Sequence, residues 1–385
     1  MPRAERPATP QACAELLRAW SDGRRTVRVR GGGTKDHLGM RAETDVVLET
    51  AGLDGIVDHV PEDLTVTVCA GMPFAALRDA LARHGQFLPL DPPHVVRGAT
   101  VGGIIAANSN GFGRFRYGSV RDLLLGVRAA LPDGTIARAG GRVVKNVAGY
   151  DLNKLFIGSF GTLGVLVEAT FKILPLPPVT RAAEATFATA GDAFGAADAI
   201  VRTSLRPTAL VVERTDDRRW RVVIAAAGER APVDRASAEF TRVCAARGAT
   251  AEPIVDPDAA LGPLREIVDS AADGIVVRAA LPLSAQPAFA DAAARADRGA
   301  RVVADAASGI ANVHLREDRA GLVAAADALL ANARVLGGSA RIERSTIADL
   351  ELSVGGAPSG AFLMRRLKDA FDPQGILEPA RVTVG

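Results

Sequence analysis

The spacing of hydrophobic positions predicts that helices and strands alternate along the chain. Residues 10–20 place Cys13, Leu17 and Trp20 on one face of a short helix. A second helix is predicted to begin near Pro73, an acceptable first-turn residue, and to end at His84. Segment 86–120 is rich in glycine and has little periodicity, so loops are expected there. Strands are predicted around these segments, at 26–30, 45–49, 56–60, 65–70, 123–131, 135–138 and 163–174.

The pattern changes after the proline-rich stretch at 174–178, which we interpret as a domain boundary. Beyond it, the expected strands are 208–213, 220–226, 274–280 and 309–315, and the alanine-rich helices are 190–203, 233–247, 285–297 and 318–332. This order favours an α+β fold with helices packed on one antiparallel sheet. The predicted domains are 1–178 and 179–358, followed by a helix and tail, 359–385, that return toward the first domain.

Composition excludes several classes of function. The chain has 385 residues, a net charge of +2 and interleaved acidic and basic residues, which argues against a nucleic-acid partner. It has no apolar run near the ~20 residues of a transmembrane helix and no apolar leader, so a cytoplasmic location is expected. The three cysteines are far apart, so we expect no metal site, no iron–sulfur cluster and no disulfide framework.

Three consecutive glycines, Gly31 to Gly33, follow the strand at 26–30. The stretch lacks the GxxxxGK[ST] pattern of a P-loop, and the residues after it do not have the helical pattern of a dinucleotide fingerprint. Two interpretations remain open. The glycines form a surface turn, or they form a nest whose successive backbone N–H groups bind an anion.

Two further glycine-rich regions favour the anion-binding nest over the surface turn. One runs from Gly98 to Gly118, and the other is the sequence GSFGTLGV at 158–165. Three such loops, each expected to leave or enter a strand, suit a long diphosphate ligand lying against backbone.

The motifs occur in one order: RGGGTKDHLG, ATVGGIIAANSNGFGRFRYGSVRDLLLGV, LPDGT, KNVAGYDLNKLFIGSFGTLGVL and FKILPLP. Together, over residues 25–178, they resemble the FAD-binding domain of PCMH-type (vanillyl-alcohol-oxidase-like) flavoproteins. Within that family the likeness is greatest to the FAD-binding subunits of bacterial glycolate oxidases. The resemblance implies an FAD-binding domain of two α/β subdomains, followed by a smaller α+β cap domain with an antiparallel sheet.

The resemblance also implies cofactor contacts for residues in each motif. The FAD diphosphate would be wrapped by the main chain of Gly31, Gly32, Gly33, Thr34 and Lys35. The diphosphate and ribityl region would be contacted by Thr100, Gly102 and Gly103, and the path toward the isoalloxazine would be lined by Asn108, Gly111, Tyr117 and Gly118. The adenine and ribose would pack beside Gly161, Gly164 and Val165, and the cofactor would also lie near Lys145, Gly149 and Tyr150.

Departures from the family pattern bear on the chemistry. Thr34 stands where relatives with a histidyl-linked flavin carry the attached histidine, so noncovalent FAD is expected. The closing element appears as LEPAR, which brings Glu378 toward the flavin by resemblance. The His-rich element of the catalytic relatives is missing, so no catalytic base is identified. His314 is expected to be a sheet residue, and Arg316, Arg341 and Arg344 could each hold a carboxylate.

The function implied by the resemblance is that of an FAD-binding subunit in a complex that oxidises glycolate, or a similar small hydroxy acid, to glyoxylate. A catalytic flavoprotein subunit and an iron–sulfur subunit would be its partners, and any attachment to the inner membrane would be made through them. Two alternatives stay open: a stand-alone FAD-dependent hydroxy-acid or alditol oxidoreductase, and a structural subunit without catalysis.

Overall fold

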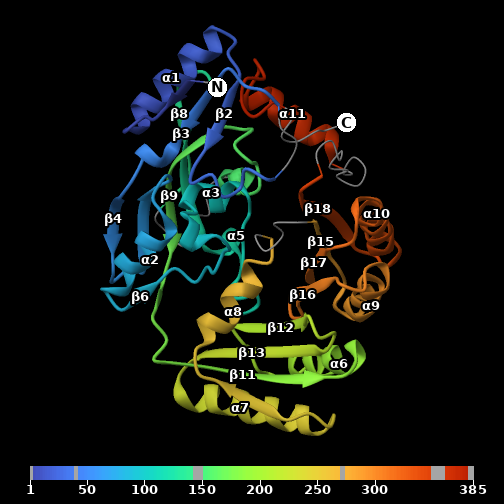
Figure 1. Cartoon of the computed structure of the whole chain (residues 1–385). Coiled ribbons are helices and arrows are strands. Elements are labelled where there is room, and N and C mark those ends of the chain that lie inside the picture. The colour runs from blue at the N-terminus through green and yellow to red at the C-terminus, as the bar shows by residue number, and fades with distance from the viewer. Residues whose placement is uncertain (1–2, 39–41, 142–150, 269–273, 348–359, 380–385) are drawn as a thin grey trace. The chain divides into compact units, whose positions relative to one another are not determined.

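The chain divides into two compact units (Figure 1). The computed structural model describes residues 3–38, 42–141, 151–268, 274–347 and 360–379. Unit 1 comprises Met1–Asn110, Gly118–Leu176 and Ala357–Gly385, and unit 2 comprises Gly111–Tyr117 and Pro177–Gly356. The short excursion 111–117 therefore interrupts unit 1. Its ends are joined within unit 1, where the Asn110 side-chain oxygen accepts a hydrogen bond from the Val120 N–H at 2.9 Å.

A small parallel sheet in unit 1 carries the first glycine loop. Its order is β1 (Arg3–Glu5), β3 (Val46–Glu49) and β2 (Val27–Arg30). Helix α1 (Pro10–Asp22) is capped by Thr9, whose side chain accepts the Ala12 N–H. Its predicted apolar face is buried in a core that it shares with β2, β3 and two strands of the second sheet, at 124–130 and 165–172. The C-terminal tail pairs with the other side of β2, at Val27 and Leu377.

The second sheet of unit 1 has five antiparallel strands. Its order is β4 (Ile56–Val60), β5 (Thr65–Cys69), β9 (Val165–Lys172), β7 (Leu124–Ala130) and β8 (Ile136–Gly140). Buried side chains of α2 (Phe74–Ala82), α3 (Val101–Ala106) and α5 (Val120–Leu123) form one core with it. Strand β6 (Gln86–Phe87) pairs with β10 (Leu174–Pro175). The remaining elements of unit 1 are helix α11 (Ala361–Phe371) and the 3₁₀ turns η1 (Thr50–Gly52), η2 (Val95–Arg97) and η3 (Leu152–Phe156).

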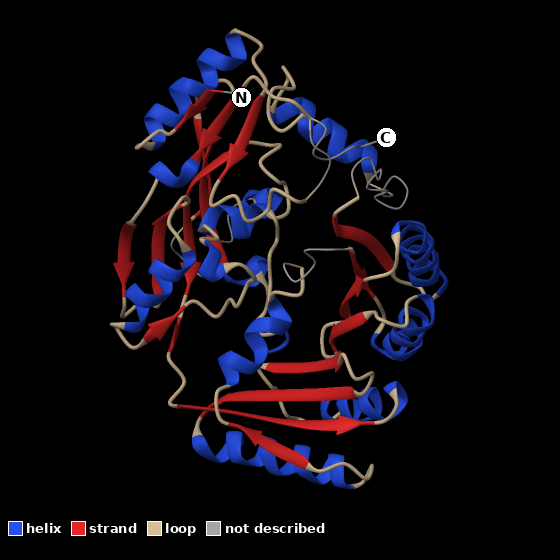
Figure 2. Ribbon diagram, viewed as in Figure 1, coloured by secondary structure: helices blue, strands red, loops and turns tan. Residues whose placement is uncertain are grey.

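Unit 2 is built on one eight-stranded antiparallel sheet (Figure 2). Its order is β14 (Ala251–Ile254), β11 (Val179–Phe187), β13 (Trp220–Gly228), β12 (Ala209–Arg214), β16 (Arg301–Asp305), β17 (Ile310–Leu315), β15 (Ile275–Ala280) and β18 (Ser339–Ser345). One face packs against helices α6 (Ala190–Val201), α7 (Arg230–Ala245), α9 (Gln286–Ala296) and α10 (Arg319–Val335). On the other face, part of the sheet is covered by α8 (Pro257–Arg265) and by Phe112. The last elements are α4 (Arg114–Tyr117) and the turn η4 (Leu283–Ala285).

The α+β class and the antiparallel sheet of the second half are confirmed, but several elements were missed. The expectation of loops throughout 86–120 was wrong, because Thr100 caps the short helix α3 despite its two glycines. Strands β1, β11, β14, β16 and β18 and helix α8 were among the other elements missed. Within the described residues, none of the helices combines the length and apolar composition needed to cross a bilayer.

Candidate functional site

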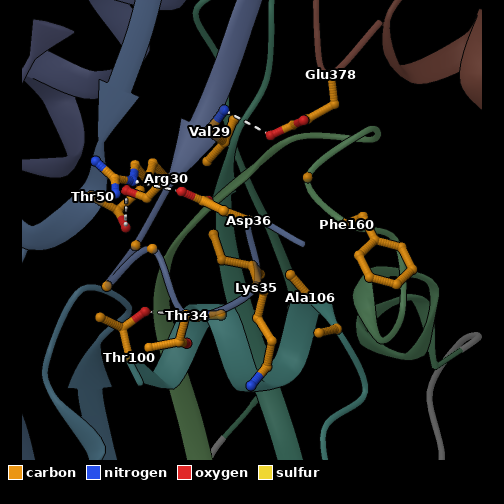
Figure 3. A pocket seen from close by; sticks show the side chains of 18 of the residues that line it. Val29, Arg30, Thr34, Lys35, Asp36, Thr50, Thr100, Ala106, Phe160 and Glu378 are labelled. Carbon is orange, nitrogen blue, oxygen red and sulfur yellow. Dashed lines mark hydrogen bonds and ion pairs between the residues drawn. The ribbon is translucent and has the colours of Figure 1, made fainter. Parts of the chain in front are cut away.

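A pocket in unit 1 lies where the end of β2, the start of α3, the turn before β9 and the C-terminal tail meet (Figure 3). The space in it that can hold the centres of water molecules is about 80 Å³, and the pocket opens to solvent. Ten of the residues predicted from sequence line it: Gly31, Gly32, Gly33, Thr34, Lys35, Thr100, Gly102, Gly103, Gly161 and Gly164. The structure thus brings the three glycine-rich loops together.

The first loop leaves a row of backbone donors without partners. Gly31, Gly32, Gly33 and Thr34 donate no backbone hydrogen bond within the part of the chain that the structure describes. Gly33 has a positive φ of 71°, which glycine adopts without strain. Successive N–H groups lining a pocket are the donor set of an anion nest, so the local geometry fits a diphosphate.

The glycines of this loop are also needed for packing. A Cβ atom built on Gly32 would lie 1.8 Å from the carbonyl oxygen of Gly98, and one on Gly31 would lie 2.3 Å from the Thr100 hydroxyl oxygen. The first loop and the loop before α3 are therefore pressed against each other. The surface-turn interpretation is incomplete, since the loop both packs closely and presents donors.

The start of α3 offers fewer free N–H groups to a ligand than the resemblance implied. Its first N–H groups are already bonded: Val101 donates to Met72 O at 3.0 Å, and Gly102 donates to Ala70 O at 2.6 Å. The Gly103 N–H donates to the Thr100 hydroxyl oxygen over a long 3.3 Å. Gly102 therefore shapes the pocket wall, where a Cβ would lie 2.9 Å from Ala70 O, and does not offer its N–H to a ligand.

The turn before β9 is held in left-handed backbone conformations. Phe160 and Gly161 have φ values of 52° and 81°, and the Phe160 N–H donates to Ala106 O at the end of α3 at 2.9 Å. A positive φ at Phe160 is unusual for a residue with a side chain. Val165, expected beside the adenine, lies in β9 with its side chain buried in the core, outside the pocket lining.

Two charged groups in the pocket were not predicted as site residues. The Arg30 guanidinium lies 3.1 Å from the Asp36 carboxylate, which also pairs with Arg28 at 3.4 Å (Figure 3). Arg30 occupies the space beside Gly33, where a Cβ would meet its Nη2 atom at 2.7 Å. This ion pair joins the last residue of β2 to Asp36 and so holds the two ends of the first glycine loop together. The alternation of Arg28 and Arg30 along β2, with an acid six residues further on, was the available signal.

Glu378 reaches the pocket from the far end of the chain. The Ile376 carbonyl accepts the Val27 N–H, and Glu378 donates its own N–H to Val27 O, both at 2.8 Å. Its carboxylate then accepts the Val29 N–H at 2.8 Å, and the side chain is buried. The carboxylate thus lies against β2, directly before the first glycine loop.

The other predicted residues are not brought to this pocket. Asn108 is exposed and Gly118 stays in unit 1, whereas Gly111 and Tyr117 belong to unit 2, and none of the four lines the pocket. Lys145, Gly149 and Tyr150 lie outside the described residues. His314 lies in β17, as expected of a sheet residue.

Comparison with known proteins identifies the domain around this pocket. Residues 3–140 match the family model described as "FAD binding domain". Over 98% of the chain, the fold matches the solved structure of p-cresol methylhydroxylase with a TM-score of 0.76 at 18% identity, covering 88% of that chain. Residues 3–140 therefore form an FAD-binding domain. An alkyldihydroxyacetonephosphate synthase matches with a TM-score of 0.77 at 17% identity, over 98% of this chain and 75% of that one. At identities this low, both matches show a likeness of fold alone.

The relatives found by sequence are named as oxidases and dehydrogenases. Glycolate oxidase subunit GlcE of Escherichia coli is 41% identical over 167 residues, which cover 43% of this chain and 47% of that protein. Glycolate oxidase subunit GlcD of Bacillus subtilis is 33% identical over 53% of this chain and 43% of its own length. This chain therefore matches less than half the length of either subunit. An uncharacterized FAD-linked oxidoreductase of Mycobacterium tuberculosis is 27% identical, over 98% of this chain and 90% of its own.

Replacing Gly103 with alanine should separate cofactor binding from folding. A Cβ at this position would meet only the Thr100 hydroxyl oxygen within 4 Å, at 3.2 Å, so it would project into the pocket. We expect a melting temperature that is unchanged or higher, since alanine is favoured over glycine in a helix by about 0.5–1 kcal/mol. We expect FAD affinity to fall about tenfold through steric exclusion. Fluorescence titration of FAD into the apoprotein checks this, and an unchanged Kd would exclude Gly103 from the cofactor site.

Replacing Glu378 with glutamine should tighten FAD binding about fivefold, because removing a carboxylate near an anionic ligand is worth on the order of 1 kcal/mol. Glutamine can still accept the Val29 N–H, so the tail should stay in place. The difference should shrink as salt is raised, since ions screen the repulsion. Glu62→Gln, at an exposed position of unit 1, is the matched control. Weaker binding in Glu378→Gln at every salt concentration would mean that the carboxylate itself holds the cofactor.

Proposed function

We propose that this chain is the FAD-binding component of a complex that oxidises glycolate, or a similar small 2-hydroxy acid, and passes the electrons to partner subunits. The observation that carries the cofactor assignment is the row of N–H groups from Gly31 to Thr34, which have no partner among the described residues and line the pocket of an FAD-binding domain. The substrate class rests on the names of the relatives, which include two glycolate oxidase subunits.

In this proposal the diphosphate lies on the nest formed by Gly31, Gly32, Gly33 and Thr34. The turn at Gly161 and Gly164 and the wall at Gly103 bound the rest of the cofactor, and Asn108, Gly111, Tyr117, Gly118 and Val165 remain predicted contacts of its other parts. When bound, FAD supplies the two-electron oxidation chemistry that no side chain can supply. The residues of the chain bind and orient it.

Noncovalent attachment is part of the proposal. Among the described residues that line the pocket, none offers an imidazole, a thiol or a phenol that could bond to the flavin. Thr34 stands at the position where a histidyl link would form. Precipitating the protein in acid should therefore release all of its flavin into the supernatant, and yellow colour retained in the pellet would contradict noncovalent binding.

Electron transfer onward is assigned to partners, because the cysteines of this chain are poor cluster ligands. Burial raises the pKa of the Cys13 thiol to about 12 and that of Cys244 to about 11, whereas metal ligation requires the thiolate. The proposed partners are a catalytic flavoprotein subunit and an iron–sulfur subunit. A cytoplasmic location is proposed with them.

An anaerobic visible spectrum, before and after glycolate, tests this function. The chain purified alone is expected to show an oxidised flavin spectrum that persists with glycolate and bleaches once a GlcD-type subunit is added. Bleaching without any partner would make the chain a stand-alone dehydrogenase. Failure of the full chain to bind FAD, even when FAD is added in excess, would leave only a structural role.

A further inference from the structure

A second pocket lies within unit 2, on the face of the eight-stranded sheet that the helices cover. It is lined by helix α6, the turn η4, the first residues of α9 and the turn that follows β16. Helices α6 and α9 contact each other in this layer (Figure 1). The space that can hold the centres of water molecules is about 280 Å³, whereas one water needs about 10–15 Å³. The pocket therefore has room for a small organic molecule.

Gln286, the first residue of α9, lines this pocket with a carboxamide whose hydrogen bonding is incomplete. Only 1% of its surface is exposed. Its Nε2 group donates to the Ala306 carbonyl oxygen at 3.3 Å, and Ala306 lines the same pocket. Because the NH₂ group faces a carbonyl, Oε1 is the end of the amide that needs a donor. This Oε1 atom is buried and has no hydrogen-bond partner among the described residues.

Gln86, a buried glutamine of unit 1, shows how such an amide is satisfied elsewhere in the chain. Its Oε1 atom lies 2.8 Å from His59 Nε2, and its Nε2 group donates to Pro61 O at 2.8 Å. A buried carbonyl oxygen without a donor is unfavourable, and most such groups in folded proteins have a partner. Gln286 therefore points to a missing hydrogen-bond donor, and the pocket that it lines is the space in which that donor can lie.

The rest of the lining indicates what kind of molecule would carry the donor. Phe194, Leu283 and Pro287 contribute apolar walls. The charged residues of the lining, Asp198 and Arg202, pair with each other at 2.6 Å, so neither is left to neutralise a charged ligand. The occupant should be neutral and mostly apolar, with one hydrogen-bond donor.

We propose that this pocket binds a small neutral alcohol with an apolar body, whose hydroxyl group donates to Gln286 Oε1. The hydroxyl oxygen can in turn accept a hydrogen bond from Ser284, which also lines the pocket. An ether or a hydrocarbon would leave Oε1 without a donor, and an ammonium or a carboxylate would bring a charge that the lining does not compensate. The site goes beyond the proposed function, because neither FAD nor the hydroxy acid takes part in it.

Cyclohexanol is the probe, and methoxycyclohexane, which has the same ring but no O–H group, is its matched partner. Ligand-observed NMR titration of the full chain with FAD gives the Kd of each. We expect cyclohexanol to bind about tenfold more tightly, because only the alcohol supplies the donor. Equal affinity for the two probes, or no binding of cyclohexanol, would mean that water alone satisfies Gln286 and would overturn the proposal.

Replacing Gln286 with methionine removes the acceptor and keeps a side chain of similar volume. We expect Gln286→Met to bind the two probes equally, with its affinity for the ether unchanged, and Gln11→Met, at an exposed glutamine of α1, to keep the tenfold preference. The ether thus reports whether the pocket is intact in each variant. A preference that survives in Gln286→Met would overturn the proposal. Loss of affinity for both probes would mean that Gln286 only supports the pocket walls, and would overturn it too.

Two charged probes test the neutrality of the ligand. Cyclohexylamine, which is protonated at neutral pH, and cyclohexanecarboxylate keep the ring and add a charge of either sign. Both should bind more weakly than cyclohexanol, because Asp198 and Arg202 are already paired with each other. Tighter binding of either one would overturn the assignment to a neutral alcohol. None of these measurements uses glycolate or a partner subunit, so their outcome is independent of the proposed function.

Discussion

Replacing Lys368 with methionine should lower the free energy of unfolding by about 3 kcal/mol or more, because it leaves a buried carboxylate without its cation. The Lys368 ammonium lies 2.5 Å from the fully buried Asp372 side chain and donates to Leu377 O at 2.7 Å and Thr162 O at 2.9 Å. Asp372 in turn accepts the N–H groups of Ile376 and Leu377. Chemical denaturation of the full chain, read by circular dichroism, measures the loss.

The matched control for this variant is Arg366→Met, on the exposed side of the same helix. It should be neutral to within about 0.5 kcal/mol, as is typical of surface changes. The effect of Lys368→Met should extend to the cofactor, since Leu377 and Glu378 lie along β2 beside the pocket. Equal stability of the two variants would mean that the network around Asp372 does not hold the tail.

Replacing Gly32 with alanine should remove FAD binding and destabilise unit 1 by about 3 kcal/mol, which is the upper end of the usual range for overpacking. The added Cβ would lie 1.8 Å from Gly98 O and 2.8 Å from Gly98 C, both backbone atoms. Neither can rotate away, so the two loops must separate and the row of N–H groups must lose its shape. FAD titration and the melting temperature of the apoprotein check the two effects.

Gly141→Ala is the control for this variant. Gly141 is in unit 1, has no positive φ, and has nothing within 4 Å of a built Cβ. It should leave both FAD affinity and melting temperature close to those of the unchanged protein. If Gly32→Ala behaved in the same way, the close packing of the two loops would be wrong.

The parts of the fold that sequence predicted are those whose pattern is local. Helix α1 has an apolar stripe and a threonine cap, and β12 is a short apolar run, so both could be predicted. Strand β18, SARIERS, has few apolar residues because it lies at an edge of the sheet. Helix α3 was hidden by its glycines, whose low helix propensity is outweighed by the Thr100 cap and by tertiary packing.

The candidate site also has parts that a local sequence pattern predicts and parts that depend on residues far apart in the sequence. Each glycine loop is recognisable from a few consecutive residues, so the order of the motifs alone indicated which segments would meet at the pocket. The bond from Val29 N to Glu378 joins residues 349 apart in sequence, and no local pattern encodes such a pairing. The occupied N–H groups at the start of α3 likewise depend on Ala70 and Met72, from a different part of unit 1.

The path of the chain between the two units limits how the protein can be dissected. A recombinant fragment ending at Leu176 would contain the whole matched family segment, yet it would lack Ala357–Gly385. Strand β2 would then lose its neighbour at Leu377, and the pocket would lose Glu378. The same fragment would carry 111–117, whose Phe112 and Phe115 pack with unit 2, as an apolar loop without its core. A minimal flavin module would instead need the tail fused back onto the fragment and the 111–117 loop replaced by a short polar linker.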